Sequence, residues 1–308
     1  MVKGIIGAII GDIVGSRFEW MNNRSTEFDF FTEVNKFTDD TVMTCAVADW
    51  LVNDDNLAEE LRLWANKYPK AGYGGKFREW VFSKDILPAY NSYGNGSAMR
   101  VSPVGFYAQT LNEAMELAKR SAEVTHNHPD GIEGAQAIAS AIFLARAGKT
   151  KGEIREFIMH WFLYDLDRTI DEIRPNYKFD ATCQGSVSEA IIAFLESTDF
   201  ESAIRLAISI GGDSDTIACM AGGIAAAYYG VPHDIVNNTM KYLKEDVKYS
   251  LMVFNTICDS RSLVDGYGDY EIYDDEAFDD FDDFVDLEDF EFDDDILKDI
   301  EEFEGGKN

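Results

Sequence analysis

The sequence predicts an all-α protein. Almost every segment with a readable hydrophobic pattern repeats its apolar residues at helical spacing, and the alternating runs typical of strands are few. The chain of 308 residues contains only 6 prolines, so few positions would interrupt a helix. Because 46% of the residues are hydrophobic, the chain can bury a large core between such helices.

The charge of the chain limits the classes of partner. The net charge is −30, and residues 265–308 alone hold 21 acidic residues and 2 lysines. Since that segment accounts for −19, residues 1–264 carry −11 and have no basic excess for a nucleic-acid backbone. No apolar run approaches the roughly 20 residues that span a bilayer. We therefore expect neither a nucleic-acid nor a membrane partner.

Cysteine usage and the N-terminus predict the compartment. The 4 cysteines lie far apart and form no C-x-x-C pair, which argues against a zinc site or a disulfide framework. A reducing compartment is favoured, so we expect a cytoplasmic protein. The apolar N-terminal run loosely imitates a signal peptide, but Asp12 interrupts it and no small-residue cleavage site follows. We interpret it as a helix of a cytosolic protein.

The first predicted helix covers residues 3–16. Gly4, Gly7 and Gly11 recur at helical spacing, although each glycine costs a helix about 1 kcal/mol relative to alanine. This cost predicts that a second helix packs closely on that side or that a ligand lies nearby. Glu19 follows between two aromatic residues, where desolvation would raise its pKa and suit acid–base chemistry. On the residues alone, an ordinary surface glutamate is the favoured interpretation.

A cluster of acids and hydroxyls, Thr38-Asp39-Asp40-Thr41, precedes the next helical pattern, at residues 42–52. Adjacent carboxylates repel each other, so their presence in one place implies a neutralising partner. Helix capping is the alternative, because Asp and Thr are good N-cap residues.

Two more helices and two loops follow. The pattern of residues 57–68 predicts an amphipathic helix that ends before Pro69, and that of residues 77–81 predicts a short helix. The glycine-rich turn between them, residues 72–76, lacks the spacing of a phosphate-binding P-loop. Residues 91–100 combine small polar residues with glycines, and their exposed backbone N–H groups could bind a phosphate or a ribose. A plain turn is the alternative. Arg100 would hold this loop or contact phosphate.

The second half of the chain continues the helical pattern. Residues 111–124 predict a helix, and we expect the two histidines after it, His126 and His128, to make hydrogen bonds rather than to bind metal. The remaining predicted helices cover residues 134–148, 150–164, 187–196, 198–209 and 217–230.

The densest polar cluster, residues 211–216, comes directly before the last of these helices, whose small apolar residues indicate burial. Asp213 and Asp215 would be costly to bury there without a cation. Their oxygens, with those of the neighbouring hydroxyls, suit a hard cation such as Mg²⁺ or Mn²⁺. Capping is again the alternative. The same arrangement of acids and hydroxyls occurs twice, about 175 residues apart, and the two clusters could share a pair of cations. This repetition weakens the capping alternative.

The composition changes after residue 264. Residues 265–308 are rich in Asp, a poor helix former, and we interpret them as a disordered acidic tail. The more specific alternative is an amphipathic helix that forms when the tail binds a basic partner or packs against residues 1–264. In that case the tail would make the chain an interaction protein.

Six motifs, in order, resemble those of the ADP-ribosylglycohydrolases, a family that includes the dinitrogenase-reductase activating glycohydrolase and the ADP-ribosyl-acceptor hydrolases. The overall pattern is most similar to uncharacterised bacterial members. The likeness runs from about residue 3 to residue 245 and leaves out the tail. The motifs are GDIVGSRFE near the start, FTDDT at 37–41, GYGG at 72–75, SYGNGSAMR at 92–100, THNHP at 125–129 and GGDSDT at 211–216.

This resemblance implies a compact, orthogonal multi-helix bundle over residues 1–264, the catalytic domain, followed by the acidic tail. It also implies a centre of two Mg²⁺ ions, or of Mn²⁺. The implied metal ligands are Thr38, Asp39, Asp40, Asp213, Asp215 and Thr216. The implied catalytic residues are Glu19, Asp40 and Asp213. The implied substrate-binding residues are Gly74, Ser92, Tyr93, Gly94, Asn95, Gly96 and His126, with Tyr73 as a further residue of the same groove.

The resemblance further implies hydrolysis of the C1″ bond of an ADP-ribosylated protein or ADP-ribose derivative, with release of ADP-ribose. ADP-ribosyl-serine, O-acetyl-ADP-ribose and ADP-ribosyl-arginine are all candidate substrates. The SYGNG motif resembles the serine and O-acetyl type, and residues 72–76 offer no acid for a guanidinium. The alternative is a catalytically inactive module that binds ADP-ribose or a nucleotide. The presence of every implied ligand counts against that alternative.

Overall fold

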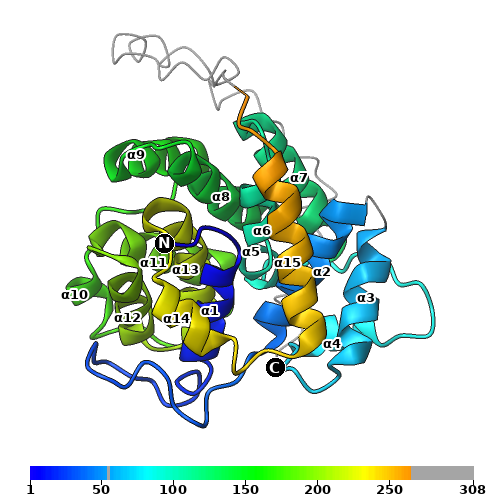
Figure 1. The fold of residues 1–308 in the computed structure, drawn as a ribbon, viewed down its shortest axis with the longest axis horizontal. Coiled ribbons are helices and arrows are strands. Elements are labelled where there is room, and N and C mark those ends of the chain that lie inside the picture. Colours follow the sequence, from blue (N-terminus) through cyan, green and yellow to red (C-terminus); the bar gives the residue numbers. More distant parts are fainter. Residues whose placement is uncertain (54–55, 265–308) are drawn as a thin grey trace, which may run out of the picture. The chain divides into compact units, whose positions relative to one another are not determined.

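The computed structural model describes residues 1–53 and 56–264. Over this part of the chain it has fifteen helices and no sheet (Figure 1), so the all-α prediction is confirmed. Two isolated β-bridges join Val2 to Val231 and Gly94 to Thr182. The predicted acidic tail, residues 265–308, lies outside the described residues.

Two helices form the centre of the fold (Figure 1). α1 (Ile6–Gly15) is buried along its whole length, and α13 (Ser214–Tyr229) is buried except at its last two residues. Helices that are apolar on every side belong inside a core. α2 (Asp39–Asn53) packs on α1, while α8 (Pro129–Arg146), α11 (Cys183–Glu196) and α12 (Phe200–Ile210) pack around α13.

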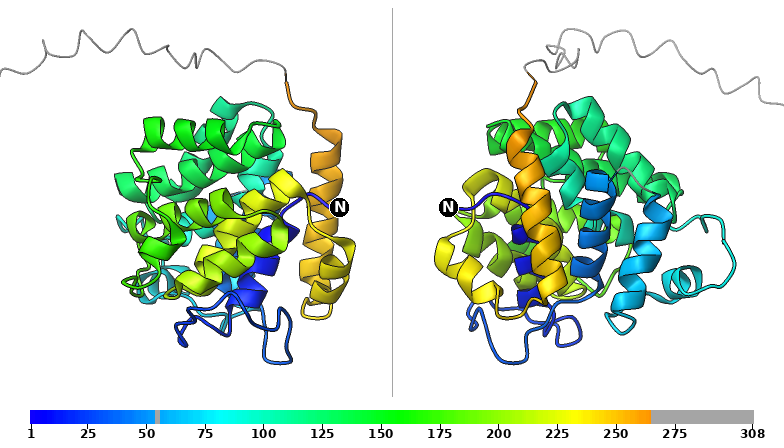
Figure 2. Two further views of the ribbon diagram at one scale, coloured as in Figure 1. Left: turned by 90° about the vertical axis from the view of Figure 1, so that its left-hand side faces the viewer. Right: turned by 45° about the vertical axis from the view of Figure 1, so that its right-hand side comes forward.

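The other helices form an outer layer. α3 (Leu57–Lys67) and α15 (Glu245–Ser260) pack on α2, and Figure 2 shows α15 beside it. α6 (Ser102–Tyr107), α7 (Leu111–Glu123) and α9 (Lys151–Phe162) pack on α8. The short helices are α4 (Gly75–Val81), α5 (Gly96–Met99), α10 (Ile170–Ile173) and α14 (His233–Thr239).

Glycines let α1 and α13 approach each other closely, as the sequence predicts. A Cβ added at Gly11 would lie 2.0 Å from the carbonyl oxygen of Ala218, and one at Gly15 would lie 2.5 Å from the Cα of Asp215. Gly4 lies outside the helix, in the left-handed region (φ +140°). The close approach places the middle of α1, with Asp12, against the acidic start of α13.

Several helices, among them α8, α11 and α13, begin earlier than their apolar patterns predict, because polar residues form their first turns. α8 begins at Pro129, after His128 accepts a hydrogen bond from a backbone N–H. α11 begins at Cys183, after Thr182 accepts one from the N–H of Gly185 at 3.0 Å. α13 begins at Ser214, so Asp215 and Thr216 belong to the first turn of a buried helix.

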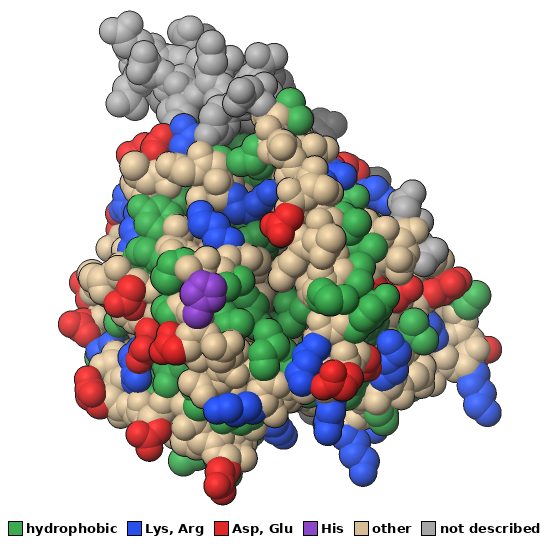
Figure 3. Space-filling model, viewed as in Figure 1, with side chains coloured by type: hydrophobic (Ala, Val, Ile, Leu, Met, Phe, Trp, Pro, Cys, Tyr) green, Lys and Arg blue, Asp and Glu red, His purple; other side chains and the backbone are tan. Residues whose placement is uncertain are grey.

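Helix length and surface charge are relevant to the predictions about membrane and nucleic-acid partners. None of the described helices combines the length and the hydrophobicity needed to cross a membrane. On the face shown in Figure 3, acidic and basic side chains are interspersed. The cysteines are free thiols, and Cys258 alone of the four is partly exposed.

Replacing Gly11 by Ala should destabilise the protein, because the added methyl group would collide with the backbone of α13. We expect the free energy of unfolding to fall by about 2 kcal/mol or more, as measured by urea denaturation. Gly152→Ala is the matched control, since its Cβ would meet only the Thr150 hydroxyl, at 3.9 Å. Equal effects of the two substitutions would show that α1 and α13 are not in close contact.

Candidate active site

The carboxylate of Asp12 ties the start of α2 to α1. Asp12 is fully buried and accepts hydrogen bonds from the N–H groups of Thr38, at 2.9 Å, and Thr41, at 3.1 Å. The hydroxyls of both threonines also donate to it, that of Thr38 at 2.7 Å. Asp12 is not among the site residues predicted from the sequence. The only sign of it there is a single acidic residue within an otherwise apolar helix.

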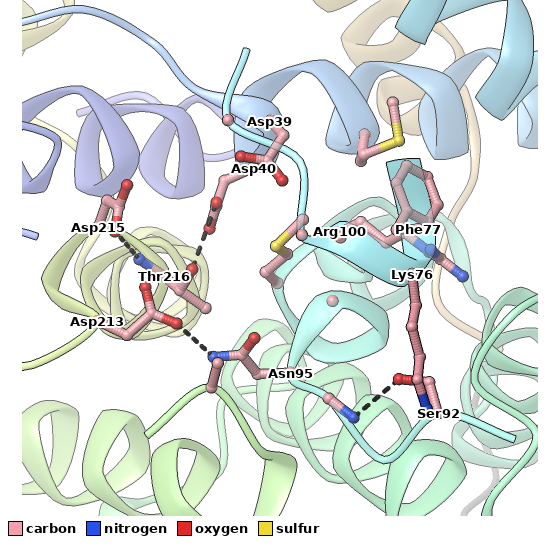
Figure 4. Close-up of a pocket in the computed structure, with 18 of the residues that line it drawn as sticks. Asp39, Asp40, Lys76, Phe77, Ser92, Asn95, Arg100, Asp213, Asp215 and Thr216 are labelled. Carbon is pink, nitrogen blue, oxygen red and sulfur yellow. Dashed lines mark hydrogen bonds between the residues drawn. The ribbon is translucent and has the colours of Figure 1, made fainter. Parts of the chain in front are cut away.

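The two acidic clusters meet in the folded chain (Figure 4). The hydroxyl of Thr216 donates to Oδ2 of Asp40 at 3.3 Å. Asp12, Asp40 and Asp215 each offer one carboxylate oxygen, and these oxygens lie within 4.8 Å of one another. The other oxygen of Asp40, Oδ1, is buried and has no hydrogen-bond partner among the described residues.

A second group of acids adjoins the first. Glu19, Asp213 and Asp215 also offer oxygens within 4.8 Å of one another, so Asp215 belongs to both groups. Asp213 occupies the N-cap position of α13, but its side chain makes no capping hydrogen bond. It accepts instead from the side-chain amide of Asn95, at 2.8 Å (Figure 4). Capping therefore does not account for Asp213.

Asp39 lies at the side of these two groups and belongs to neither. A Cβ added at Gly72 would lie 2.8 Å from its Oδ1, so the glycine-rich turn packs directly against this carboxylate. Gly72 is in the left-handed region, at φ +127°, which favours glycine. Burial, and next the charge of Asp12, raises the pKa of Asp39 to about 8.

Burial raises the pKa of all six carboxyl groups at this end of the site. For Asp40 and Asp215 the neighbouring carboxylates raise the pKa further, and for Glu19 the charge of Asp213 does so, opposed by a hydrogen bond from the side chain of Trp20. For Asp12 and Asp213, hydrogen bonds oppose the effect of burial on the pKa, chiefly those from Thr38 and Thr41 to Asp12 and from Asn95 to Asp213. No ion pair of the described residues includes any of the six acids.

These residues fit a hard divalent cation. Buried carboxylates without a cationic side chain are costly, and the unpartnered Oδ1 of Asp40 lacks the donor that a buried acceptor needs. Every atom that the two groups offer is a carboxylate oxygen, with the hydroxyl of Thr216 beside them. Oxygen donors of this kind suit Mg²⁺ or Mn²⁺. Each group can therefore hold a metal ion.

A cavity of about 380 Å³ extends from the acids. Beyond the acids it is lined by the loop before α5, by the turn at residues 72–76 and by His126. Figure 4 shows the acids on one side and Ser92, Lys76 and Arg100 on the other. The predicted site residues that line it are Glu19, Asp39, Asp40, Gly74, Ser92, Gly94, Asn95, Gly96, His126, Asp213, Asp215 and Thr216.

His126 lines the cavity beside the loop before α5. It is buried, and burial, with a smaller effect of the Arg100 charge, holds its pKa well below the usual value. The Thr125 hydroxyl accepts from Arg100 at 3.0 Å and lies 2.7 Å from Nδ1 of His126. This arrangement favours a proton on Nε2. A Cβ at Gly96 would lie 3.0 Å from Nε2, so a glycine leaves this nitrogen room.

Arg100 is a buried cation that makes no ion pair with any described acid. Its Nη2 donates to the carbonyl oxygen of Ser121 at 2.7 Å, while Nε is buried without a hydrogen-bond partner in the described chain. Burial lowers the pKa of Arg100 to about 10. The side chain thus holds the loop in place and also lines the cavity, while its predicted contact with phosphate stays a prediction.

Three predicted site residues lie outside the cavity lining. Thr38 is buried against Asp12, as described above. Tyr93 is 52% exposed and its ring packs edge-on against His128, with 5.4 Å between ring centroids. Tyr73 is buried and donates to the carbonyl oxygen of Tyr68 at 3.0 Å. The roles of these three in binding metal or substrate stay predictions.

Known proteins resemble this chain in sequence and fold. A sequence model of the family described as ADP-ribosylglycohydrolase matches residues 1–260. ADP-ribosylhydrolase ARH3 of Xenopus tropicalis is 27% identical, over 73% of this chain and 86% of the relative. The human ARH3 is also 27% identical, over 74% and 84%. ADP-ribosylarginine hydrolase Tri1 of Pseudomonas putida is 24% identical, over 74% and 70%.

A solved structure shares the fold. It is titled "ADP-ribosylglycohydrolase-related protein complex", and it aligns with a TM-score of 0.64 and 20% sequence identity. The alignment covers 82% of this chain and 96% of the other. At this identity the likeness supports the predicted multi-helix fold.

Adding Mg²⁺ or Mn²⁺ should raise the melting temperature, because a cation relieves the repulsion among the buried acids. Asp215→Asn should remove most of this rise, since Asp215 belongs to both acidic groups. Thermal denaturation with and without EDTA measures the effect. Asp234→Asn, at an exposed acid of α14, is the matched control and should keep the rise. A metal-dependent rise that survives Asp215→Asn would contradict the predicted site.

Without metal, Asp39 should make the protein less stable as the pH rises. The folded state keeps the proton up to a pKa of about 8, whereas the unfolded chain releases it near pH 4, so stability falls through this window. Asp39→Asn removes this loss. In EDTA, we expect the unfolding free energy of the variant, relative to the unaltered protein, to rise by about 1 kcal/mol from pH 5 to pH 8. A flat difference would contradict the raised pKa.

Proposed function

Because this chain belongs to the ADP-ribosylglycohydrolase family and is a hydrolase of glycosyl bonds, we propose that it cleaves the C1″ bond of ADP-ribosylated substrates with the help of two Mg²⁺ ions. One observation carries the proposal. The cavity is lined both by acids of the two groups that share Asp215 and by His126, Arg100 and the loop before α5, which offer hydrogen-bond donors. Such a cavity suits a ligand with hydroxyls at one end and a diphosphate at the other.

The proposed metal ligands are Thr38, Asp39, Asp40, Asp213, Asp215 and Thr216. When bound there, the ions would bind the hydroxyls of the distal ribose and lower the pKa of a water molecule. Mn²⁺ could take the same oxygen donors.

The protein's own groups contribute positioning, charge and proton transfer. Glu19 is half-buried at the edge of the acids, and the direction of its pKa shift, upward through burial, suits a group that transfers a proton. The carboxylates of Asp40 and Asp213 lie where they can stabilise the positive charge of an oxocarbenium-like transition state. Asp12 contributes by holding the start of α2, and with it Asp40, in place.

At the other end, the residues suit a diphosphate. Nε2 of His126 faces the glycines of the loop and can donate a hydrogen bond to a phosphate oxygen. Arg100 adds a buried positive charge beside it. Gly74, Ser92, Gly94, Asn95 and Gly96 complete the proposed substrate contacts, because small side chains there leave the backbone accessible.

The proposal also concerns the acceptor, which is the group that carries the ADP-ribose. The relatives are named for ADP-ribosyl and for ADP-ribosylarginine hydrolysis, so their names do not decide it. Lys76 lines the wall formed by residues 72–76, and this turn contains no acid; the carboxylate packed beside it, that of Asp39, is a proposed metal ligand. A guanidinium is therefore disfavoured at this wall, and we favour serine-linked ADP-ribose or O-acetyl-ADP-ribose.

Domain organisation and location are part of the same proposal. Residues 1–264 would form the catalytic domain in the cytoplasm, with residues 265–308 as an acidic tail able to bind a basic partner. The match to the family ends at residue 260, before this tail begins.

Purified protein with Mg²⁺ should release free ADP-ribose from an ADP-ribosylated peptide, measured by chromatography. Glu19→Gln should lower kcat by about 100-fold or more, because it removes the proton-exchanging group. The Kd for ADP-ribose should stay within about threefold, since the amide keeps the shape of the side chain.

Glu33→Gln, at an exposed glutamate outside the cavity, is the matched control and should leave kcat unaltered. The contrary result is tight binding of ADP-ribose by the unaltered protein with no release from any ADP-ribosylated substrate. That result would favour the alternative of an inactive binding module.

A further inference from the structure

Two large aromatic side chains stack on each other at the rim of the cavity. The ring centroids of Trp20 and Phe179 lie 5.2 Å apart, and their planes differ by 11°. Both residues line the cavity, yet the side chain of Trp20 is 79% exposed and that of Phe179 is 47% exposed. The two rings come from distant parts of the chain, so the fold itself assembles this exposed apolar surface.

The pair lies at the acidic end of the cavity. Trp20 follows Glu19 directly in the chain, and both residues line the cavity. Phe179 belongs to a segment that packs against Gly212, next to Asp213. A Cβ added at Gly212 would lie 2.6 Å from the ring of Tyr177 and 3.3 Å from the carbonyl oxygen of Lys178.

This position decides which part of a substrate can reach the rings. If the diphosphate lies near His126 and the C1″ atom lies among the acids, the group bonded to C1″ points away from His126. Since Trp20 and Phe179 line the cavity next to Glu19 and are exposed to solvent, this group would leave the cavity past them. The acceptor, and not the ADP-ribose, is then the part of the substrate next to the stacked rings.

From this geometry we infer that Trp20 and Phe179 form a platform for the polypeptide on which the ADP-ribose is carried. The inference rests on the proposed function and narrows its substrate class to ADP-ribosylated proteins. With most of Trp20 and nearly half of Phe179 exposed, the pair offers more apolar surface than an acetyl group or a single small side chain can cover. The residues flanking the modified one can supply this area, and exposed aromatic residues commonly anchor such contacts.

The test compares two substrates that share one ADP-ribosyl linkage. One is an ADP-ribosylated decapeptide, and the other is the single ADP-ribosylated amino acid. The unaltered enzyme should have the higher kcat/KM for the peptide. Phe179→Ala should reduce this preference by about five- to tenfold, and Phe179→Tyr should retain it, because an aromatic ring remains. Phe179 is the better test position, since changes at Trp20 would also affect Glu19.

Tyr249→Ala, at an exposed aromatic residue of α15 outside the cavity, is the matched control and should keep the preference. An unchanged preference in Phe179→Ala would overturn the inference. So would a tenfold weaker Kd for free ADP-ribose in that variant, which would show that the rings bind the nucleotide. If the unaltered enzyme cleaves neither substrate, the proposed function fails as well, so the two failures are distinguishable.

Discussion

The buried carboxylate of Asp12 is the interaction on which the site depends. It comes from the middle of α1 and accepts hydrogen bonds from the N–H groups and hydroxyls of Thr38 and Thr41. The start of α2 is thereby fixed to α1. Because the glycines of α1 let α13 pack at backbone contact, the same helix also holds the start of α13 in place. Two acidic segments far apart in the sequence therefore meet.

Bringing these acids together has a cost in stability. Six carboxyl groups with raised pKa values lie at one end of the cavity without an ion pair among the described residues. The large apolar core that α8, α11 and α12 form around α13 contributes stability that offsets this cost. A bound divalent cation would relieve it, so the feature that weakens the metal-free fold is also the one that suits the proposed chemistry.

Much of the fold and part of the site follow from the sequence, because they depend on local pattern. Helical periodicity predicts most of the long helices, and the spacing of Gly7 and Gly11 predicts the close approach of α1 to another helix. The meeting of Asp40 with Asp215 was an expectation from two similar clusters. Asp12 was missed because a lone acid in an apolar helix gives no sign of its partners. The hydrogen bonding and burial of His126 and the stacking of Trp20 on Phe179 depend on residues that only folding brings together.

The most direct test is to load the metal-free protein with Mn²⁺ and record its electron paramagnetic resonance spectrum. Since Asp215 belongs to both acidic groups, two Mn²⁺ ions per chain should bind close together and give the spectrum of a magnetically coupled pair. A spectrum of one isolated ion, or no binding at all, would show that the starts of α2 and α13 do not build a shared metal centre.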